Sequence, residues 1–338
     1  MSEAPNPPTT PLLLDLITGG WRAQITAAVA HIGVADRIAE GRNTLFALAE
    51  VAGAKPDALA RLLRAAVGIG LMSERDGVFA MTDVGDGLRG NHPRSLRDMA
   101  TMVNSPGHWQ PWSLLWKAAL TGKTTVEETF GTDIWTYYRT HSDEAENFAR
   151  AMTNMTAIGA SEVSSVFDPS PYALIVDVGG SQGSLLAALL ERAPEAKGVI
   201  FDLEHVRGGA EAAIAARGLA GRVRFDGGNF FSAVTPDGDL YVLKFILHDW
   251  PDEDCVRILQ SIRKAAKPTS RLIVVEMLVP ERPSDSFVNL LDLNMMVLVG
   301  GRERTAAEYQ DLLRRAGFVL ETVKQTPGLN AVLEARIA

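Results

Sequence analysis

The 338-residue chain has a single cysteine, Cys255, and no long apolar run. One cysteine excludes an internal disulfide and favours a reducing compartment. No apolar stretch approaches the roughly 20 residues that a membrane-spanning helix needs. The first residues, MSEAPNPPTT, lack the basic segment and apolar core of a secretory signal. We therefore expect a cytoplasmic protein with no membrane partner.

Basic residues are also not in excess. The chain has 33 Lys and Arg against 41 Asp and Glu, a net charge of -8, and the two signs are interspersed. Nucleic-acid binding needs clustered basic residues, so the composition argues against a nucleic-acid partner. Hydrophobic residues make up 46% and charged residues 22%, which is typical of a folded globular protein. The length predicts two domains, which we place at residues 1–165 and 166–338.

The first domain has the pattern of a winged-helix module. LFALAEVAGAKPDALARLLRAAVGIGLM contains two helical patterns separated at GAKPDA, and alternating residues around Asp76 and Gly77 predict a hairpin. A DNA-binding function would need more basic residues, because the expected recognition helix offers only Arg61 and Arg64. A packing or dimerisation module is favoured, while a ligand-sensing regulator remains an alternative.

The second domain alternates between strands and helices. Continuous apolar runs such as ALIVDVGG, KGVIFDL, LYVLKFIL and SRLIVVEMLVP are separated by helical patterns. This order predicts an α/β fold with a parallel sheet that helices cover on both faces. The end of the chain instead predicts two strands joined at TPGL, which form an antiparallel hairpin at or near the sheet edge.

The turn after the first of these strands, DVGGSQG, is rich in glycine. Gly179, Gly180 and Gly183 let the backbone turn tightly and approach a ligand, but their spacing fits the dinucleotide fingerprint poorly. Asp202 ends the next strand, nineteen residues after Gly183, where an acid can accept hydrogen bonds from ribose hydroxyls. These residues predict a ribose-bearing cofactor, either NAD in an oxidoreductase or S-adenosylmethionine in a methyltransferase. Tight packing without a ligand is the third interpretation.

A histidine stands where a strand stops and a helix starts, in KFILHDWPDEDC. His248 is either an ordinary loop histidine or a general base, because its unperturbed pKa is near 6.5 and leaves it mostly neutral at pH 7. Together with Asp249 it could supply two metal ligands. No third histidine or carboxylate follows at an obvious spacing, so we expect no metal.

Six motifs in order carry a family resemblance: DVGGSQG, FDLEHV, GGNFF, LKFILHDWPDEDC, VVEMLVPE and GGRERTAAEYQDLLRRAGF. The chain resembles the two-domain S-adenosylmethionine-dependent small-molecule O-methyltransferases typified by plant caffeic acid O-methyltransferase, with bacterial relatives that tailor polyketides and phenazines. The resemblance implies a Rossmann-like class I methyltransferase domain and an N-terminal winged-helix-like dimerisation domain. It also implies a homodimer and a small, aromatic hydroxylated substrate from secondary metabolism. C- or N-methylation on the same scaffold remains open.

The resemblance also implies roles for individual residues. The catalytic base would be His248, held by Glu276 and Glu303. The cofactor would contact the following residues: Gly179, Asp202, Asn229, Phe230, Lys244 and Thr156. The substrate would contact another set: Met152, Met155, Asn294, Leu298 and Asp249. Asn294 is polar within an apolar run and needs a partner if buried, which we expect to be a substrate oxygen.

Three positions depart from the pattern of the family. Ser181 replaces the middle glycine of the loop, which the turn tolerates if its φ is negative. Asn229 replaces the usual acid, which weakens an adenine contact. Leu298 stands where the plant enzymes have a polar substrate-gripping residue, so phenylpropanoid substrates are not assumed.

Overall fold

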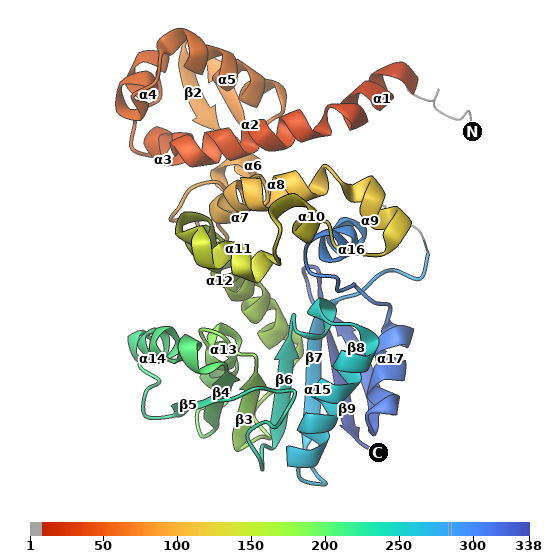
Figure 1. Ribbon diagram of the computed structural model, residues 1–338. Coiled ribbons are helices and arrows are strands. Elements are labelled where there is room, and N and C mark those ends of the chain that lie inside the picture. The colour runs from red at the N-terminus through yellow and green to blue at the C-terminus, as the bar shows by residue number, and fades with distance from the viewer. Residues whose placement is uncertain (1–8, 283, 285) are drawn as a thin grey trace, which may run out of the picture. The chain divides into compact units, whose positions relative to one another are not determined.

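The computed structural model describes residues 9–282, 284 and 286–338, in two compact units (Figure 1). The first unit runs up to Trp109 and includes Tyr138–Asn154, and the second comprises Gln110–Tyr137 and Met155–Ala338. The long helix α12 (Ser142–Val166) contributes residues to both units. A domain boundary at residue 165 stays a prediction. Among the described residues, every helix is too short or too polar to cross a bilayer.

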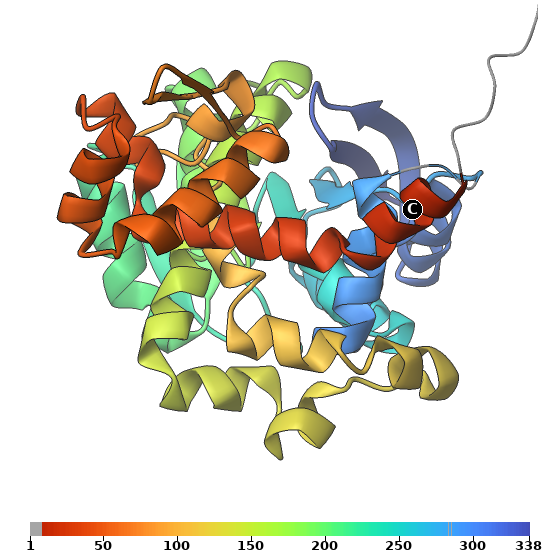
Figure 2. The same cartoon turned by 90° about the horizontal axis from the view of Figure 1, so that it is seen from above.

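The first unit is mainly helical. Its helices α1 and α2 follow one another in nearly one line, drawn in red in Figures 1 and 2. The helices of this unit that precede α12 are α1 (Thr9–Ile17), α2 (Gly19–Ile32), α3 (Val34–Ala39), α4 (Leu45–Ala52), α5 (Pro56–Gly68), α6 (Asp83–Asp86), α7 (Arg97–Met102), the start of α8 (Pro106–Trp112) and the end of α11 (Ile134–Thr140). The core of this unit is formed by apolar residues from α2 to α5 together with the first strand.

The expected hairpin joins β1 (Met72–Arg75) to β2 (Val78–Met81) in antiparallel register. Asp76 and Gly77, with φ of 52° and 78°, are both in the left-handed region, as a tight two-residue hairpin turn requires. The break between the two preceding helices also lies where the sequence predicts it. Gly53 ends α4 with φ of 61°, and Pro56 begins α5. The predicted order of helices and hairpin is therefore confirmed.

The second unit is built on a seven-stranded sheet with the order β5-β4-β3-β6-β7-β9-β8. Five strands are parallel: β3 (Leu174–Val178), β4 (Lys197–Asp202), β5 (Val223–Gly227), β6 (Leu240–Lys244) and β7 (Arg271–Met277). The last two, β8 (Phe318–Gln325) and β9 (Asn330–Ile337), form the predicted antiparallel hairpin at one edge. Figure 1 shows the strands in this order, with helices packed on the sheet.

Alternating strand residues divide the core of this unit into two layers. On one face, Val176 and Tyr241 pack with α15 (Asp252–Ala265) and α17 (Ala306–Arg315). On the other, Ile175 and Val242 pack with α12, α13 (Ser184–Arg192) and α14 (Arg207–Ala216). The remaining elements are α9 (Leu115–Thr121), α10 (Val126–Phe130), α16 (Phe287–Leu298) and two 3-10 turns, η1 (Glu204–Val206) and η2 (Leu247–Asp249).

Candidate active site

The strand order reverses between β3 and β6, because the chain runs outward from β3 to β5 and then returns to the other side of β3. Ligands of open α/β sheets bind beyond the carboxyl ends of the strands at such a point. The loops that follow β3 and β6 are in contact here. A Cβ added to Gly179, just after β3, would lie 2.4 Å from Cδ1 of Ile246, just after β6.

The glycine loop after β3 takes conformations that favour glycine. Gly179 and Gly183 have φ of 75° and 69°, and a Cβ on Gly183 would lie 2.5 Å from Cδ1 of Ile200. Ser181 also has positive φ, at 47°, so the condition under which the turn tolerates a serine without strain is not met. Such a φ strains a non-glycine residue by about 1–2 kcal/mol, and here the strained residue lies within the predicted binding loop.

Asp202 ends β4 and holds the glycine loop. Its Oδ2 accepts the backbone N–H of Ser181 at 2.9 Å, and its Oδ1 accepts the N–H of Leu203 at 2.7 Å. A carboxylate has about four acceptor positions, so both oxygens can accept further hydrogen bonds from a ligand. The carboxylate is only partly buried, and with the close-packed glycine backbone it fits a ribose-bearing cofactor.

Asn229 and Phe230 follow β5. Asn229 is exposed, and its Oδ1 accepts the N–H of Phe231 at 2.9 Å, which leaves its amide NH2 for other partners. The ring of Phe230 is partly buried and makes edge contacts with Phe231 and Trp250, at centroid distances of 5.0 and 6.1 Å. An apolar ring fixed by two aromatic neighbours suits the wall of a site for a flat base.

Lys244 ends β6 and is partly buried. Its Nζ lies 3.4 Å from Oγ1 of Thr156 on α12 and 3.9 Å from the ring centroid of Phe245. Burial lowers the pKa of Lys244 to about 8, although Glu276 and Asp177 act in the opposite direction. The predicted cofactor residues Lys244 and Thr156 are therefore neighbours, although 88 residues separate them.

Asp177 is a buried acid that was not predicted as a site residue from the sequence. It lies on β3 and is 3% exposed, and its carboxyl would be 2.9 Å from a Cβ on Gly180. Burial raises the pKa of Asp177 to about 7, against the lowering effect of Lys244. An acid placed within an apolar strand and just before the glycines was the available signal.

His248 lies in the 3-10 turn η2, just past the end of β6. The chain leaves β6 through Phe245, whose φ of 54° is unusual for an aromatic residue. The Phe245 ring stacks on the His248 ring, with centroids 5.3 Å apart and an interplanar angle of 21°. The strained residue therefore both turns the chain and packs against the histidine.

Two buried carboxylates face the histidine. Nδ1 of His248 lies 2.7 Å from Oε1 of Glu303 and 3.9 Å from Oε2 of Glu276. Glu276, at the end of β7, also accepts the backbone N–H of Leu247 through Oε1 at 3.0 Å. The Glu303 contact engages one ring nitrogen, and the other, Nε2, lies 3.5 Å from Oδ1 of Asp249. The three residues predicted as catalytic are thus in one cluster.

These acids change the protonation of His248. Burial by itself lowers the pKa of His248, but Glu276, Glu303 and Asp249 outweigh it and raise the pKa to about 9. The expectation of a mostly neutral histidine at pH 7 is therefore wrong for the free protein. Glu276 is affected by its own burial, which raises the pKa of its carboxyl to about 7. The cause was invisible in the sequence, because the acids come from distant segments.

The same three residues also bear on the metal alternative. One ligand atom from each of His248, Glu276 and Glu303 lies within 4.8 Å of the others, so the third ligand that the sequence spacing failed to suggest is present. Two carboxylates with a histidine are donors that divalent transition metals accept. Nδ1 of His248 is nevertheless in hydrogen-bond contact with Glu303, an arrangement that serves an acid–base histidine.

The predicted substrate residues have different surroundings. Asn294 on α16 accepts the indole N–H of Trp112 through Oδ1 at 2.8 Å, which leaves its amide NH2 available for the substrate oxygen that we expect beside it. Leu298 is buried, whereas Met152, Met155 and Asp249 are partly buried. Trp112 was not assigned a role from the sequence, and its 182-residue separation from Asn294 offers no signal. Substrate contact of all five predicted residues stays a prediction.

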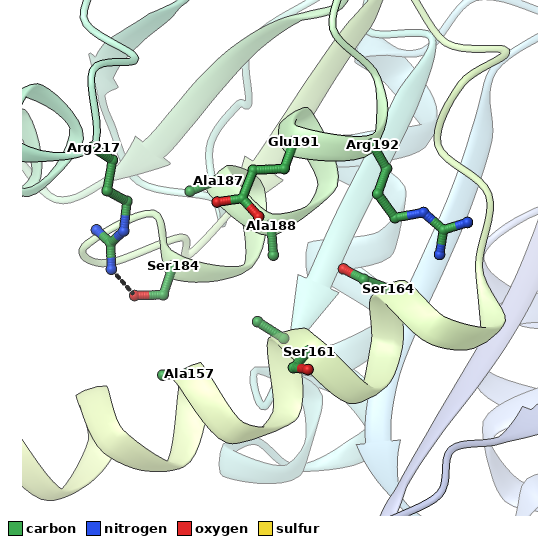
Figure 3. Close-up of a pocket in the computed structure, with 10 residues that line it drawn as sticks. Ala157, Ser161, Ser164, Ser184, Ala187, Ala188, Glu191, Arg192 and Arg217 are labelled. Atoms are coloured by element: carbon green, nitrogen blue, oxygen red, sulfur yellow. Dashed lines mark hydrogen bonds between the residues drawn. The ribbon is translucent and has the colours of Figure 1, made fainter. Parts of the chain in front are cut away.

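A surface hollow of about 370 Å³ lies elsewhere on the second unit (Figure 3). Small residues of α12 and α13 line it, and Arg217 donates a hydrogen bond to Ser184 Oγ at its rim, at 3.2 Å. None of the predicted site residues is among the residues that line it. It is therefore separate from the His248 cluster.

Comparisons with known proteins identify the family of the chain. One family model, an O-methyltransferase dimerisation domain, matches residues 14–89, and another, an O-methyltransferase domain, matches residues 112–319. A phenazine O-methyltransferase from Lysobacter antibioticus is 36% identical over 97% of this chain and 96% of its own length. A 3-amino-4-hydroxybenzoate 4-O-methyltransferase from Streptomyces cremeus is also 36% identical, over 93% of this chain and 87% of its own.

One further relative has a structure with S-adenosylmethionine bound, and another is named for methylation of nitrogen. The structure of human N-acetylserotonin methyltransferase in complex with S-adenosylmethionine superposes with a TM-score of 0.90 and 28% identity, covering 100% of both chains. An 8-amino-8-demethylriboflavin N,N-dimethyltransferase from Streptomyces davaonensis is 33% identical over 93% of this chain and 91% of its own. The chain therefore belongs to the S-adenosylmethionine-dependent O-methyltransferases of small secondary metabolites, with an N-terminal dimerisation domain and a C-terminal class I methyltransferase domain.

Proposed function

We propose that this enzyme methylates a hydroxyl group of a small aromatic metabolite, with His248 taking the hydroxyl proton. The observation that carries the proposal is the 2.7 Å contact between His248 Nδ1 and Glu303 Oε1, at the carboxyl ends of the strands where the glycine loop also lies. When bound, S-adenosylmethionine supplies an electrophilic methyl group on a sulfonium. Gly179, Asp202 and Lys244 would hold it, and Thr156, Asn229 and Phe230 would complete its site.

The hydroxyl must lose its proton as it attacks. A phenol has a pKa near 10, so it is mostly neutral at pH 7 and a weak nucleophile. With Nδ1–H donated to Glu303, Nε2 carries the lone pair that can accept this proton. Glu276 and Glu303 then stabilise the imidazolium, and the resulting rise in the histidine pKa to about 9 brings it close to that of a phenol. Proton transfer within the pair therefore costs little free energy.

Substrate contacts are proposed for several apolar and polar side chains. Leu298 and Met155 offer apolar or polarisable surface, as flat aromatic rings prefer. The indole of Trp112 engages the oxygen of Asn294, so the amide of Asn294 can offer only its NH2 group, which is a donor. Met152 and Asp249 complete the proposed set. An aromatic acceptor with an oxygen near its hydroxyl would match these groups.

The test uses 3-amino-4-hydroxybenzoate, the acceptor named for the Streptomyces cremeus relative, with formation of S-adenosylhomocysteine as the signal. This probe carries a hydroxyl and an amino group, and mass spectrometry with NMR identifies the methylated atom. 2,7-Dihydroxy-5-methyl-1-naphthoate, the acceptor named for a further relative, serves as a second probe. We expect O-methylation that His248→Ala lowers by at least about 10²-fold at pH 7 while cofactor affinity is retained.

The matched control is His92→Ala, at a partly exposed histidine of the first unit, which should leave the rate unchanged. The deficit of His248→Ala should shrink above about pH 9, where the wild-type rate has levelled off while the phenol goes on to ionise without a base. Full activity of His248→Ala at pH 7 would show that the histidine is not the base. Methylation at the amino group would favour the N-methyl chemistry that the riboflavin-type relative is named for.

A further inference from the structure

Residues Gly301–Arg304, here called the 301–304 segment, lie against the turn that carries His248. The backbone N–H of Arg302 donates to the carbonyl oxygen of His248 at 2.8 Å. A Cβ on Gly301 would lie only 2.0 Å from that same oxygen, so the two backbones are as close as a glycine allows. The segment therefore holds His248 by its main chain as well as by the Glu303 side chain.

The last residue of the segment, Arg304, reaches beneath the same turn. It is fully buried, and its Nη1 donates to the carbonyl oxygen of Leu247 at 2.9 Å. Its Nη2 donates to the carbonyl oxygen of Trp250 at 2.8 Å, and Nη2 and Nε both contact Oδ1 of Asp252, at 2.7 and 3.0 Å. One planar guanidinium thus binds the carbonyls on both sides of the His248–Asp249 pair.

These contacts supply hydrogen-bond donors to carbonyl groups of the 3-10 turn. A 3-10 turn of three residues leaves carbonyls without helical partners, and a buried carbonyl without a hydrogen bond is costly. Leu247 is buried, and besides Arg304 its carbonyl oxygen accepts the N–H of Trp250 at a long 3.3 Å and the thiol of Cys255 at 3.1 Å, both weaker contacts than that of a charged donor. Arg304 therefore supplies the strong hydrogen bonds that fix this backbone.

The backbone of the 301–304 segment is also joined to the strand that carries Glu276. Arg304 forms an isolated parallel bridge with Leu278, directly after β7, and its carbonyl accepts the N–H of Val279 at 3.0 Å. The backbone N–H of Glu303 donates to Oδ1 of Asp292 on α16 at 2.8 Å. The segment is thus fixed to the end of β7 and to α16 as well as to the His248 turn.

We propose that Arg304 is a positioning residue for the general base, because its guanidinium holds the Leu247 and Trp250 carbonyls and so sets where Nε2 of His248 lies. The inference rests on the proposed role of His248. The positioning role requires the fork geometry of arginine, since a lysine ammonium is a point donor and cannot span both carbonyls in one plane. A displacement of about 1 Å at a reacting group can cost about 10²-fold in rate.

A purely structural role is the competing explanation, and the chain offers a matched comparison. Arg222 also donates from one guanidinium to several backbone carbonyls, those of Ala193, Ala196 and Leu190, at the end of α13 and away from His248. The variants Arg304→Lys and Arg222→Lys therefore remove the same kind of multiple carbonyl contact. Asp252→Asn removes only the carboxylate partner of Arg304 and leaves both carbonyl contacts available.

The experiment measures turnover of 3-amino-4-hydroxybenzoate at pH 7, with the melting temperature and the affinity for S-adenosylhomocysteine as folding controls. We expect Arg304→Lys to lower kcat by about 10- to 100-fold with little change in cofactor affinity. Arg222→Lys should change the melting temperature but not kcat, and Asp252→Asn should have a smaller effect on kcat than Arg304→Lys. Unchanged kcat in a folded Arg304→Lys variant would overturn the proposal.

A second readout separates positioning of the base from general damage. A nitro-substituted phenol that is already ionised at the assay pH needs no base, so Arg304→Lys should methylate it at nearly the wild-type rate. In a His248→Ala background, Arg304→Lys should have no further effect on the neutral phenol, because the two residues act through one step. Equal losses on both phenols, or additive losses in the double variant, would assign Arg304 a structural role only. If His248→Ala alone is fully active, the proposed base fails, and the positioning role fails with it.

Discussion

Glu303 follows His248 by 55 residues, yet its Oε1 lies 2.7 Å from Nδ1 of the imidazole. Both side chains are buried, so the contact is little weakened by solvent. It selects the tautomer with the proton on Nδ1 when the ring is neutral, and it stabilises the ring when it is charged. The proposed base is therefore strong but mostly protonated in the free enzyme at neutral pH.

This relationship predicts the pH dependence of the reaction. The pKa of His248 is raised to about 9, so kcat/KM for a neutral phenol should rise from pH 7 towards pH 9 as the base loses its proton. In Glu303→Gln the charge that favours imidazolium is gone, and the pKa of His248 should fall. The rising limb should then move to lower pH, while the plateau rate drops at least about tenfold because the base is weaker and less well oriented.

The measurement is a pH series of kcat/KM on the wild type and the variant. Glu321→Gln, at an acid on β8 that pairs with Arg271 and Arg336, is the control and should leave the profile unchanged. A limb that stays near pH 9 in Glu303→Gln would assign the pKa of His248 to Glu276 and Asp249 alone.

Asp202 should determine cofactor affinity. Removal of a charged acceptor that binds ligand hydroxyls costs roughly 1.5–3 kcal/mol, so Asp202→Ala should weaken S-adenosylhomocysteine binding by about 10- to 100-fold. The loss also frees the N–H of Ser181, which adds disorder to the glycine loop. Isothermal calorimetry measures the affinity, and Asp202→Asn, which keeps one acceptor oxygen, should be intermediate. Wild-type affinity in Asp202→Ala would remove this residue from the cofactor site.

Ser181 should be a site where glycine stabilises the protein. Its φ of 47° costs an L-residue about 1–2 kcal/mol, while glycine costs about 0.5–1 kcal/mol through the unfolded chain. Ser181→Gly should therefore raise the free energy of unfolding by about 0.5–1 kcal/mol, as measured by urea denaturation. Gly183→Ala is the opposite case, since its φ is 69° and its Cβ would meet Ile200, and it should destabilise. A destabilised Ser181→Gly variant would show that the serine side chain makes a contact that outweighs the strain.

The parts of the fold and site that could be predicted follow local rules. The apolar runs give the parallel strands, and Asp202 and His248 stand at strand ends where parallel strands place side chains along one edge. The hairpin at Asp76 and Gly77 was predictable because two residues that tolerate positive φ lie between alternating segments. The closing hairpin was predictable because a proline and a glycine, both typical turn residues, lie between two apolar segments.

The remainder depends on contacts between distant residues. The pKa of His248 depends on Glu276 and Glu303, which lie on separate segments, and the partner of the Asn294 oxygen is 182 residues away. Arg304 looks in the sequence like one more charged residue of GGRERT, and only its burial and its carbonyl contacts distinguish it. The positive φ of Ser181 arises because the loop keeps a glycine conformation with a serine in it.

The first two helices predict a homodimer. Leu13, Leu16 and Ile17 of α1 are 57, 70 and 68% exposed, and Trp21 of α2 is 72% exposed. Such a group of large apolar side chains is expensive to leave in water and marks a protein partner, which for one gene product is most often a second copy related by a two-fold axis. The match of residues 14–89 to a dimerisation domain supports this partner. We expect an interface above roughly 2,000 Å², as in obligate dimers.

Light scattering at micromolar concentration should give a dimer for the wild type. Leu16→Glu with Ile17→Glu should shift it towards monomer, because a carboxylate buried in an apolar interface has no partner there. Leu120→Glu is the matched control, since this leucine on α9 is 78% exposed but belongs to the second unit. In the double variant we expect substrate binding to suffer more than cofactor binding, because the predicted cofactor residues all lie in the second unit. A wild-type monomer under these conditions would contradict the dimer and leave the apolar residues of α1 to a different protein partner.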